Sequence, residues 1–291
     1  MRSIQEIKAF ITQALDPSFR GQLVARGEAR AIVRRNGDLP PDAPNFASSI
    51  EADLTDYGFS LLDAALELRS LDRSNQLAKQ AFRASGTVFE ALTKNGDVTL
   101  ANRGFLRIIS AASHHLAGYS AVAFSLFSSF RDADLNLNSA EKCLVMLILR
   151  NLEEVRNISR TWLEEPNHQD LAMAQLLVDP DIDRNDVLSS AVISGLMRGL
   201  SHFEFALQTG EASLIEEAQK LLDAAYGLAG ETGQVTLWWI LRLTRGLIAD
   251  LWADTLHQVI PLQPVAGESE LYEKNRTIFI AALFSQSTSH V

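Results

Sequence analysis

The amino-acid sequence predicts an all-α protein. Apolar residues recur at intervals of three and four along most of the chain, which is the spacing that lines one face of a helix. The alternating runs rich in Val, Ile and Thr that are typical of strands are almost absent. Short breaks rich in Gly, Pro, Asn and Asp separate the helical stretches. We therefore expect an irregular stack of antiparallel helical hairpins, arranged as a solenoid or as a helical bundle.

The predicted helices follow one another with few long gaps. They cover residues 2–15, 17–35, 50–70, 73–94, 99–117, 119–131, 139–164, 168–178, 185–208, 211–230, 232–259 and 269–285. Three of the breaks have a clear physical cause. One glycine and three prolines interrupt residues 36–44, residues 94–97 contain an Asn-Gly turn dipeptide, and Ser139 is a suitable N-cap for the helix that it begins.

These breaks also suggest a domain organisation. Residues 1–45 would form N-terminal helices and a proline-rich linker, residues 46–262 a helical-hairpin domain, and residues 263–291 a C-terminal helix and tail. A chain of 291 residues with 47% hydrophobic and 21% charged residues is long and apolar enough to bury a sizeable core.

Charge and cysteine content narrow the class of protein. The formal net charge of -10 excludes a uniformly basic nucleic-acid binder, so any contact with nucleic acid has to be local. A single cysteine, Cys143, permits no intramolecular disulfide and no zinc site built from several thiolates. The N-terminus lacks the pattern of a secretory signal, and the most apolar windows, 143–149 and 235–252, are too short or too charged to cross a bilayer. We expect a cytoplasmic protein with no membrane contact and no cofactor.

One residue spacing occurs three times. Steps of twelve and then four residues separate Ala111, Ala123 and Phe127, then Ala206, Ala218 and Leu222, and, with a leucine first, Leu66, Ala78 and Phe82. In an antiparallel hairpin, a small residue on each helix allows close approach and a larger one a turn later fills the groove. The spacing resembles that of tetratricopeptide-type repeats, and Gly118 falls where such a repeat turns. The three copies are not at a constant period of about 34 residues, however, so the stack should be irregular.

Four segments carry a second, longer resemblance. They are "ARGEARAIVRRNGDLPPDAPNFASSIEADLTDYGFSLLDAALELR" (25–69), "AFRASGTVFEAL" (81–92), "SAASHHLAGYSAVAFSLF" (110–127) and "LWADTLHQVIPL" (251–262). Together they are similar to the helical N-terminal region that precedes the motor in large bacterial DEAD/DEAH-box helicases of superfamily 2, many of which are associated with defence against phage. The resemblance spans roughly residues 20–285 and depends on apolar and small-residue patterns.

That resemblance implies a non-catalytic accessory domain. Its partner would be a helicase motor or a nuclease subunit, with DNA as a further possibility, and the chain would be either part of a helicase or a separate polypeptide. The ATPase strings G-x-x-x-x-G-K-[ST] and D-E-x-[DH] do not occur, so ATP hydrolysis by that machinery is excluded. The alternative is a free-standing tetratricopeptide-like adaptor that binds a protein or peptide. A helical enzyme whose site is assembled from scattered residues is a third possibility.

Arginines are the candidate contact residues. Arg26, Arg30 and Arg34 recur at four-residue steps, with Arg35 beside them, and would form one stripe able to contact phosphates or an acidic surface. Its alternative is a solvated helix face paired with acids elsewhere.

A second arginine group, Arg242 and Arg245, lies beside Trp238 and Trp239. This composition is compatible with nucleobase stacking. More often, such tryptophans lie in the core and the arginine stems extend along them.

Histidine and cysteine are two other residue types that can bind metal ions or act in catalysis. His114 and His115 are neighbours on a helix and therefore point about 100° apart, so both cannot bind one metal ion from a shared face. Cys143 lies within an apolar helix, where burial raises the pKa of a thiol. We expect packing or hydrogen-bonding roles for all three and no metal site.

Overall fold

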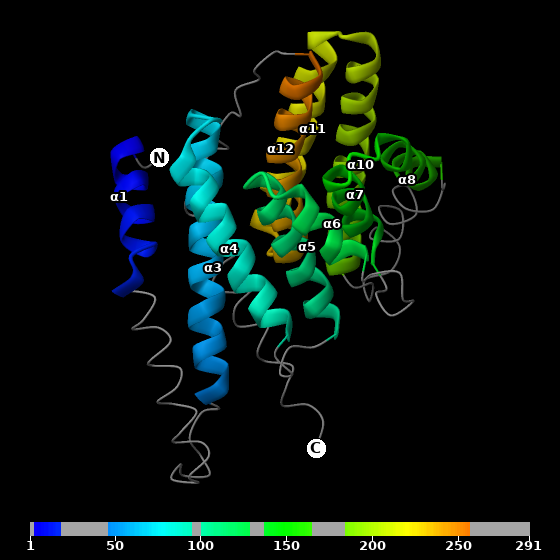
Figure 1. The fold of residues 1–291 in the computed structure, drawn as a ribbon. Coiled ribbons are helices and arrows are strands. Elements are labelled where there is room, and N and C mark those ends of the chain that lie inside the picture. Colours follow the sequence, from blue (N-terminus) through cyan, green and yellow to red (C-terminus); the bar gives the residue numbers. More distant parts are fainter. Residues whose placement is uncertain (1–2, 19–45, 95–99, 129–136, 165–183, 257–291) are drawn as a thin grey trace, which may run out of the picture. The chain divides into compact units, whose positions relative to one another are not determined.

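The computed structural model describes residues 3–18, 46–94, 100–128, 137–164 and 184–256 (Figure 1). These stretches contain ten α-helices and no strand, which confirms the predicted all-α class. The predicted helices at 168–178 and 269–285, and nearly all of the one at 17–35, lie outside the described residues.

The described helices belong to two compact units. The N-terminal unit contains α1 (Ile4–Ala14), α3 (Phe46–Leu71), α4 (Gln76–Lys94), α5 (Leu100–Leu116) and α6 (Ser120–Ser128). The C-terminal unit contains α7 (Ser139–Ile148), α8 (Leu152–Glu164), α10 (Arg184–Thr209), α11 (Ala212–Glu231) and α12 (Val235–Leu256). The predicted hairpin domain at 46–262 thus includes helices of both units, and its limits at residues 45 and 262 lie outside the described residues.

Consecutive helices of the N-terminal unit pack against one another in chain order. Helix α1 packs on α3 and α4, and the pairs α3–α4, α4–α5 and α5–α6 are all in contact (Figure 1). Ile7 and Ile11 bury one face of α1, and the Tyr57 hydroxyl of α3 donates to the carbonyl of Ala14 at 2.7 Å. Gly118, at φ 91°, makes the turn between α5 and α6, where the sequence predicted it.

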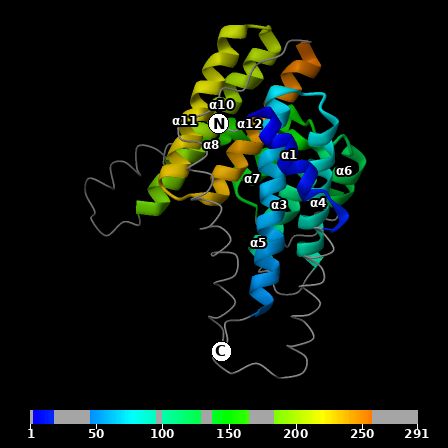
Figure 2. The same ribbon diagram turned by 90° about the vertical axis from the view of Figure 1, so that its left-hand side faces the viewer.

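The C-terminal unit is built around α12. Helices α10 and α11 lie side by side as a long antiparallel hairpin (Figure 2), and α12 contacts α7, α10 and α11. Gly210 and Gly233, with positive φ angles of 72° and 74°, end α10 and α11 in the left-handed conformation that favours glycine at a helix C-terminus. Most of α12 is buried, and the core includes all three of its tryptophans.

The hairpins predicted from the repeated spacing are present. Helix pairs α3–α4, α5–α6 and α10–α11 each pack together, and every residue of the three spacings is buried: Leu66, Ala78, Phe82, Ala111, Ala123, Phe127, Ala206, Ala218 and Leu222. Within each unit, the described helices therefore pack as antiparallel hairpins at irregular intervals along the chain.

Glycines inside the helices set how closely the hairpins approach. A Cβ on Gly195 of α10 would lie 2.8 Å from the Cβ of Ala225 on α11. A Cβ on Gly199, one turn later, would lie 2.6 Å from Cγ of Leu222. Real Cβ atoms do not approach so closely, so the α10–α11 spacing requires glycine at both positions.

One predicted helix is wrong. The sequence predicts a continuous helix over 139–164, but the structure has α7 and α8 with a break at residues 149–151. Arg150 adopts a left-handed φ of 57°, and the amides of Arg150 and Asn151 return to the carbonyls of Leu147 and Met146, at 3.0 and 2.9 Å. This is the Schellman arrangement that usually employs glycine, so an arginine gave no signal for it.

Two helix starts also differ from the prediction. Asn138, rather than Ser139, is the N-cap of α7: its side chain accepts from the amide of Glu141, and the Glu141 carboxylate accepts from the amide of Asn138. This reciprocal pair satisfies two amides that a helix start otherwise leaves without partners. Helix α3 begins at Phe46, four residues before the predicted start.

The close approach of α10 and α11 predicts opposite effects for two glycine-to-alanine substitutions in the same hairpin. Gly195→Ala should destabilise the C-terminal unit by about 1–3 kcal/mol, because the new methyl meets Ala225, which has no flexible side chain to move away. Gly227→Ala is the matched control: nothing lies within 4 Å of its new Cβ, so it should stabilise by about 0.5–1 kcal/mol. Urea unfolding followed by circular dichroism measures both, and equal effects would contradict the close approach.

The α7–α8 break predicts a difference between two substitutions at Arg150. Both Arg150→Gly and Arg150→Ala remove the exposed ion pair with Asp254, 2.7 Å long, which contributes at most about 1 kcal/mol. Only glycine relieves the left-handed φ, so Arg150→Gly should be more stable than Arg150→Ala by about 1 kcal/mol. Thermal unfolding of the two variants tests this, and a more stable alanine variant would show that the turn is not left-handed in solution.

Candidate functional site

At two helix crossings in the N-terminal unit, a serine hydroxyl donates a hydrogen bond to a glycine carbonyl of the neighbouring helix. At the α3–α4 crossing, the Ser85 hydroxyl donates to the carbonyl of Gly58 at 2.9 Å. A Cβ on Gly58 would lie 2.9 Å from Cζ of Phe89, the residue one turn after the serine. The glycine thus accepts a hydrogen bond and also leaves space for an aromatic ring.

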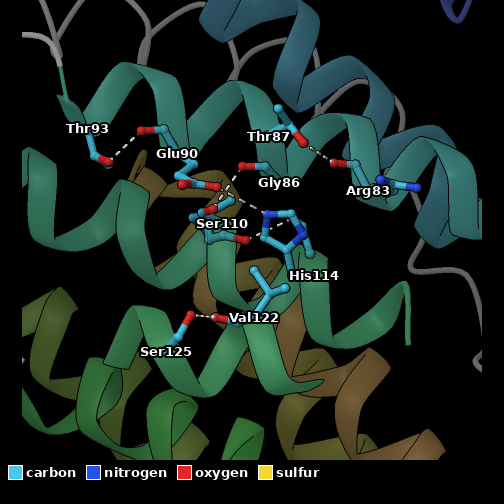
Figure 3. A network of polar contacts seen from close by, with 11 residues as sticks. Arg83, Gly86, Thr87, Glu90, Thr93, Ser110, His114, Val122 and Ser125 are labelled. Atoms are coloured by element: carbon cyan, nitrogen blue, oxygen red, sulfur yellow. Dashed lines mark hydrogen bonds and ion pairs between the residues drawn. The ribbon is translucent and has the colours of Figure 1, made fainter. Parts of the chain in front are cut away.

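The α4–α5 crossing repeats this arrangement with a histidine in place of the phenylalanine. The Ser110 hydroxyl donates to the carbonyl of Gly86 at 2.8 Å, and a Cβ on Gly86 would lie 3.0 Å from the imidazole of His114. His114 follows Ser110 by four residues, as Phe89 follows Ser85. Figure 3 shows the imidazole beside the backbone of Gly86. His114 therefore occupies, at the α4–α5 crossing, the position that the packed ring of Phe89 occupies at the α3–α4 crossing.

His114 has an unusual electrostatic environment for such a ring. It is 6% exposed, and its Nε2 lies 3.8 Å from Oε2 of Glu90, which is longer than a hydrogen bond (Figure 3). Within the described part of the chain, that Nε2 has no hydrogen-bond partner. Burial lowers the pKa of His114; the Glu90 carboxylate opposes this shift and the Arg83 guanidinium adds to it. The side chain is consequently neutral at pH 7.

The adjacent histidine has a different environment, as the sequence predicted. His115 is half-buried, and its Nδ1 lies 3.3 Å from the hydroxyl of Ser120, at the start of α6. The two imidazoles therefore belong to different contacts, one at the α4–α5 crossing and one at the α5–α6 turn.

An exposed aromatic and an arginine meet next to this crossing. Arg83 of α4 donates from Nη1 to the hydroxyl of Tyr119 at 3.2 Å, and its guanidinium lies 5.0 Å from the centre of the Tyr119 ring. Tyr119 is 42% exposed, and Phe124, also on the α5–α6 hairpin, is 43% exposed. We name Arg83, Tyr119 and Phe124 the hairpin-tip group.

The structure places the second predicted arginine group in the core. Trp238 and Trp239 are fully buried, and the Arg242 guanidinium lies over both rings, 5.2 and 5.6 Å from their centres. The guanidinium of Arg245 lies 4.8 Å from the ring centre of Tyr226, and its Nε is 2.7 Å from a carboxylate oxygen of Asp223. These guanidiniums stack on internal rings, so a nucleobase could reach Trp238 or Trp239 only if α12 left the core.

The first predicted arginine group lies outside the described residues. It comprises Arg26, Arg30, Arg34 and Arg35, and its role as a phosphate or partner contact stays a prediction.

Cys143 is buried in the C-terminal unit. It is 1% exposed, and its Sγ lies 3.7 Å from Sδ of Met197 on α10. Burial is the main cause that raises the pKa of the thiol to about 12. Its environment is therefore that of an apolar core side chain.

The residues that the structure describes contain neither a cluster placed to hold a metal ion nor a helix suited to span a membrane. Over those ranges, no group of three or more His, Cys, Asp or Glu side chains is placed to hold a metal ion. In the same part of the chain, no helix combines the length and the apolar character that a membrane span requires.

Sequence reasoning did not single out the hairpin-tip group or the serine-to-glycine crossings. A signal for the crossings is present in the sequence: each serine follows its glycine after about one hairpin, 27 residues for Ser85 and 24 for Ser110, and precedes a ring by four. No local pattern distinguishes Tyr119 and Phe124 from buried aromatics, because their exposure depends on where α6 packs.

Comparisons with known proteins do not assign the chain to a family. No model of a protein family matches it. No curated protein has significant sequence similarity to it.

The environment of Cys143 predicts that its thiol is unreactive in the folded protein. With a pKa of about 12, roughly one thiol in 10,000 is ionised at pH 8, and the sulfur is also out of contact with solvent. A thiol-specific reagent should modify less than about a tenth of the folded chains in the time that it modifies all chains in denaturant. Because the chain has one cysteine, the number of modified thiols equals the number of modified chains. Rapid modification of the folded protein would contradict the buried position.

Proposed function

We propose that this chain is a non-catalytic helical interaction protein. Its partner would be a helicase motor, a nuclease subunit or DNA, as the resemblance to the N-terminal region of superfamily 2 helicases implies. The alternative is a tetratricopeptide-like adaptor that binds a protein or peptide. A cytoplasmic location agrees with either function.

The observation that supports this proposal is the hairpin-tip group. Arg83 and Tyr119 hold each other by a hydrogen bond and by stacking, so both side chains are ordered before any partner arrives. Ordering in advance lowers the entropic cost of binding. Arginine and aromatic residues are also the types enriched in the cores of interfaces. An exposed tyrosine ring beside a guanidinium is suited to stacking on nucleobases as well as to contacts with protein.

The rigid stack behind the group supports the same function. Arg83 belongs to α4, which is held on one side by the Ser85–Gly58 bond and on the other by the Ser110–Gly86 bond. A surface with a fixed backbone presents its side chains in one arrangement, which favours specific binding over general adhesion.

Single-stranded DNA is the first probe, because it tests the function that the helicase resemblance implies. Tyr119→Ala should lower the affinity for a labelled single-stranded oligonucleotide about tenfold, since stacking of one base on an aromatic side chain is worth about 1–3 kcal/mol. Arg83→Ala should have a similar effect and should reduce the salt dependence by about one phosphate contact. Fluorescence anisotropy at two salt concentrations measures both.

Matched controls separate a local effect from a loss of folding. Tyr119→Phe keeps the ring and removes only the hydroxyl bonded to Arg83, so it should bind nearly as well as the wild type. Arg160→Ala changes an exposed arginine of α8 and should not alter binding.

Absence of binding to single-stranded and double-stranded DNA at low salt would reject the nucleic-acid function and favour the adaptor. Equal binding by Tyr119→Ala and the wild type would move the contact to another surface, with Arg26, Arg30 and Arg34 as the next set to replace.

A further inference from the structure

We propose that His114 makes the α4–α5 crossing sensitive to pH, so that α5 is held firmly against α4 when the imidazole is neutral and is released when it is protonated. This inference concerns regulation of the fold and does not depend on the binding function proposed above.

The first argument is the comparison between the two crossings. Both have a glycine, a serine that donates to the carbonyl of that glycine, and a ring one turn after the serine. At the α3–α4 crossing the ring is Phe89, which cannot change its charge. At the α4–α5 crossing it is His114, the side chain whose charge ordinarily changes between pH 5 and 8.

The second argument is the confinement of the imidazole. The ring occupies the space that a side chain at Gly86 would need, because a Cβ there would lie only 3.0 Å from Cδ2 and Nε2 of His114. It is 6% exposed, and its buried Nε2 has no hydrogen-bond partner within the described residues. A neutral imidazole tolerates this site, whereas an imidazolium needs a partner for each of its N–H groups.

The charged and titratable groups around the ring cannot supply that partner without movement. Glu90 and Arg83 face the imidazole from α4: the carboxylate is 3.8 Å away and partly exposed, and the guanidinium repels a second positive charge. The α5–α6 turn contributes His115 and Tyr119, which are engaged with Ser120 and Arg83. Helix α6 itself carries no titratable side chain.

The direction of the pH effect follows from these contacts. Burial holds the pKa of His114 in the packed crossing below its usual value, so the unfolded or opened chain binds a proton more readily than the packed one. The contribution of His114 to stability is complete above the ordinary histidine pKa of about 6.5 and falls as the pH decreases toward the folded value. Acidification therefore opens the crossing.

Hydrogen exchange of the full chain, read by mass spectrometry on peptides from α4 and α5, tests the proposal at about pH 7.5 and pH 5.5. After correction for intrinsic exchange rates, the opening equilibrium of wild-type protein should rise about five- to tenfold at the lower pH, which is the effect of one extra proton bound by the open state. His114→Phe, which copies the α3–α4 crossing, should remove this rise. His115→Gln is the matched control and should keep it.

Two further measurements settle the assignment. If His114→Phe does not fold, His114→Gln is the substitute, because it cannot be protonated and should be equally insensitive to pH. In wild-type protein, the Cε1 proton of His114 should titrate below the ordinary histidine value of about 6.5 by nuclear magnetic resonance. An equal rise in opening in the neutral variant and the wild type, or titration of His114 at or above the ordinary histidine value, would overturn the proposal.

Discussion

The fold depends on backbone approach at glycines inside helices. Gly58 and Gly86 allow the N-terminal helices to come close enough for a serine of the next helix to reach a carbonyl, and Gly195 and Gly199 bring α10 against α11. Glycine is unfavourable within a helix by about 1 kcal/mol relative to alanine, so the crossings must return at least this much through packing and hydrogen bonds. Each serine also fixes the register of its helix pair, because its hydroxyl can reach only one turn of the neighbour.

At the α4–α5 crossing, the side chain of His114 is poorly suited to its surroundings. Packing explains why a ring is there, since Phe89 occupies the equivalent place at the other crossing. It does not explain why the ring is polar, because an unbonded buried nitrogen costs free energy that a phenyl group avoids. A buried histidine that only packs in the core normally donates a hydrogen bond to a carbonyl or carboxylate. Glu90, at 3.8 Å, is near enough to influence the imidazole and too far to satisfy it.

Periodicity was sufficient to predict the fold class and the hairpins, because helix faces and turn residues are local properties. It failed at the α7–α8 break, where Arg150 takes a left-handed conformation within local backbone hydrogen bonds that its residue type does not indicate. The site was harder to predict for a different reason. Trp238 and Arg242 have the composition of a stacking surface and also of a stacked core, and only the burial of α12 distinguishes the two. The exposure of Tyr119 likewise depends on packing that no local pattern encodes.

The two proposals meet in helix α4. Arg83 reaches Tyr119 across the same α4–α5 boundary that His114 seals, and the guanidinium also acts on the imidazole. Separation of α5 from α4 would therefore break the exposed Arg83–Tyr119 pair as well as the buried contact. A partner that binds this pair therefore favours the packed crossing. Because the two equilibria are linked, protonation of His114 weakens the binding of the partner, and the bound partner lowers the proton affinity of His114 by the same free energy. The α4–α5 crossing, His114 and the hairpin-tip group then act as one two-state element, which responds both to the proton on His114 and to a partner bound at Arg83 and Tyr119.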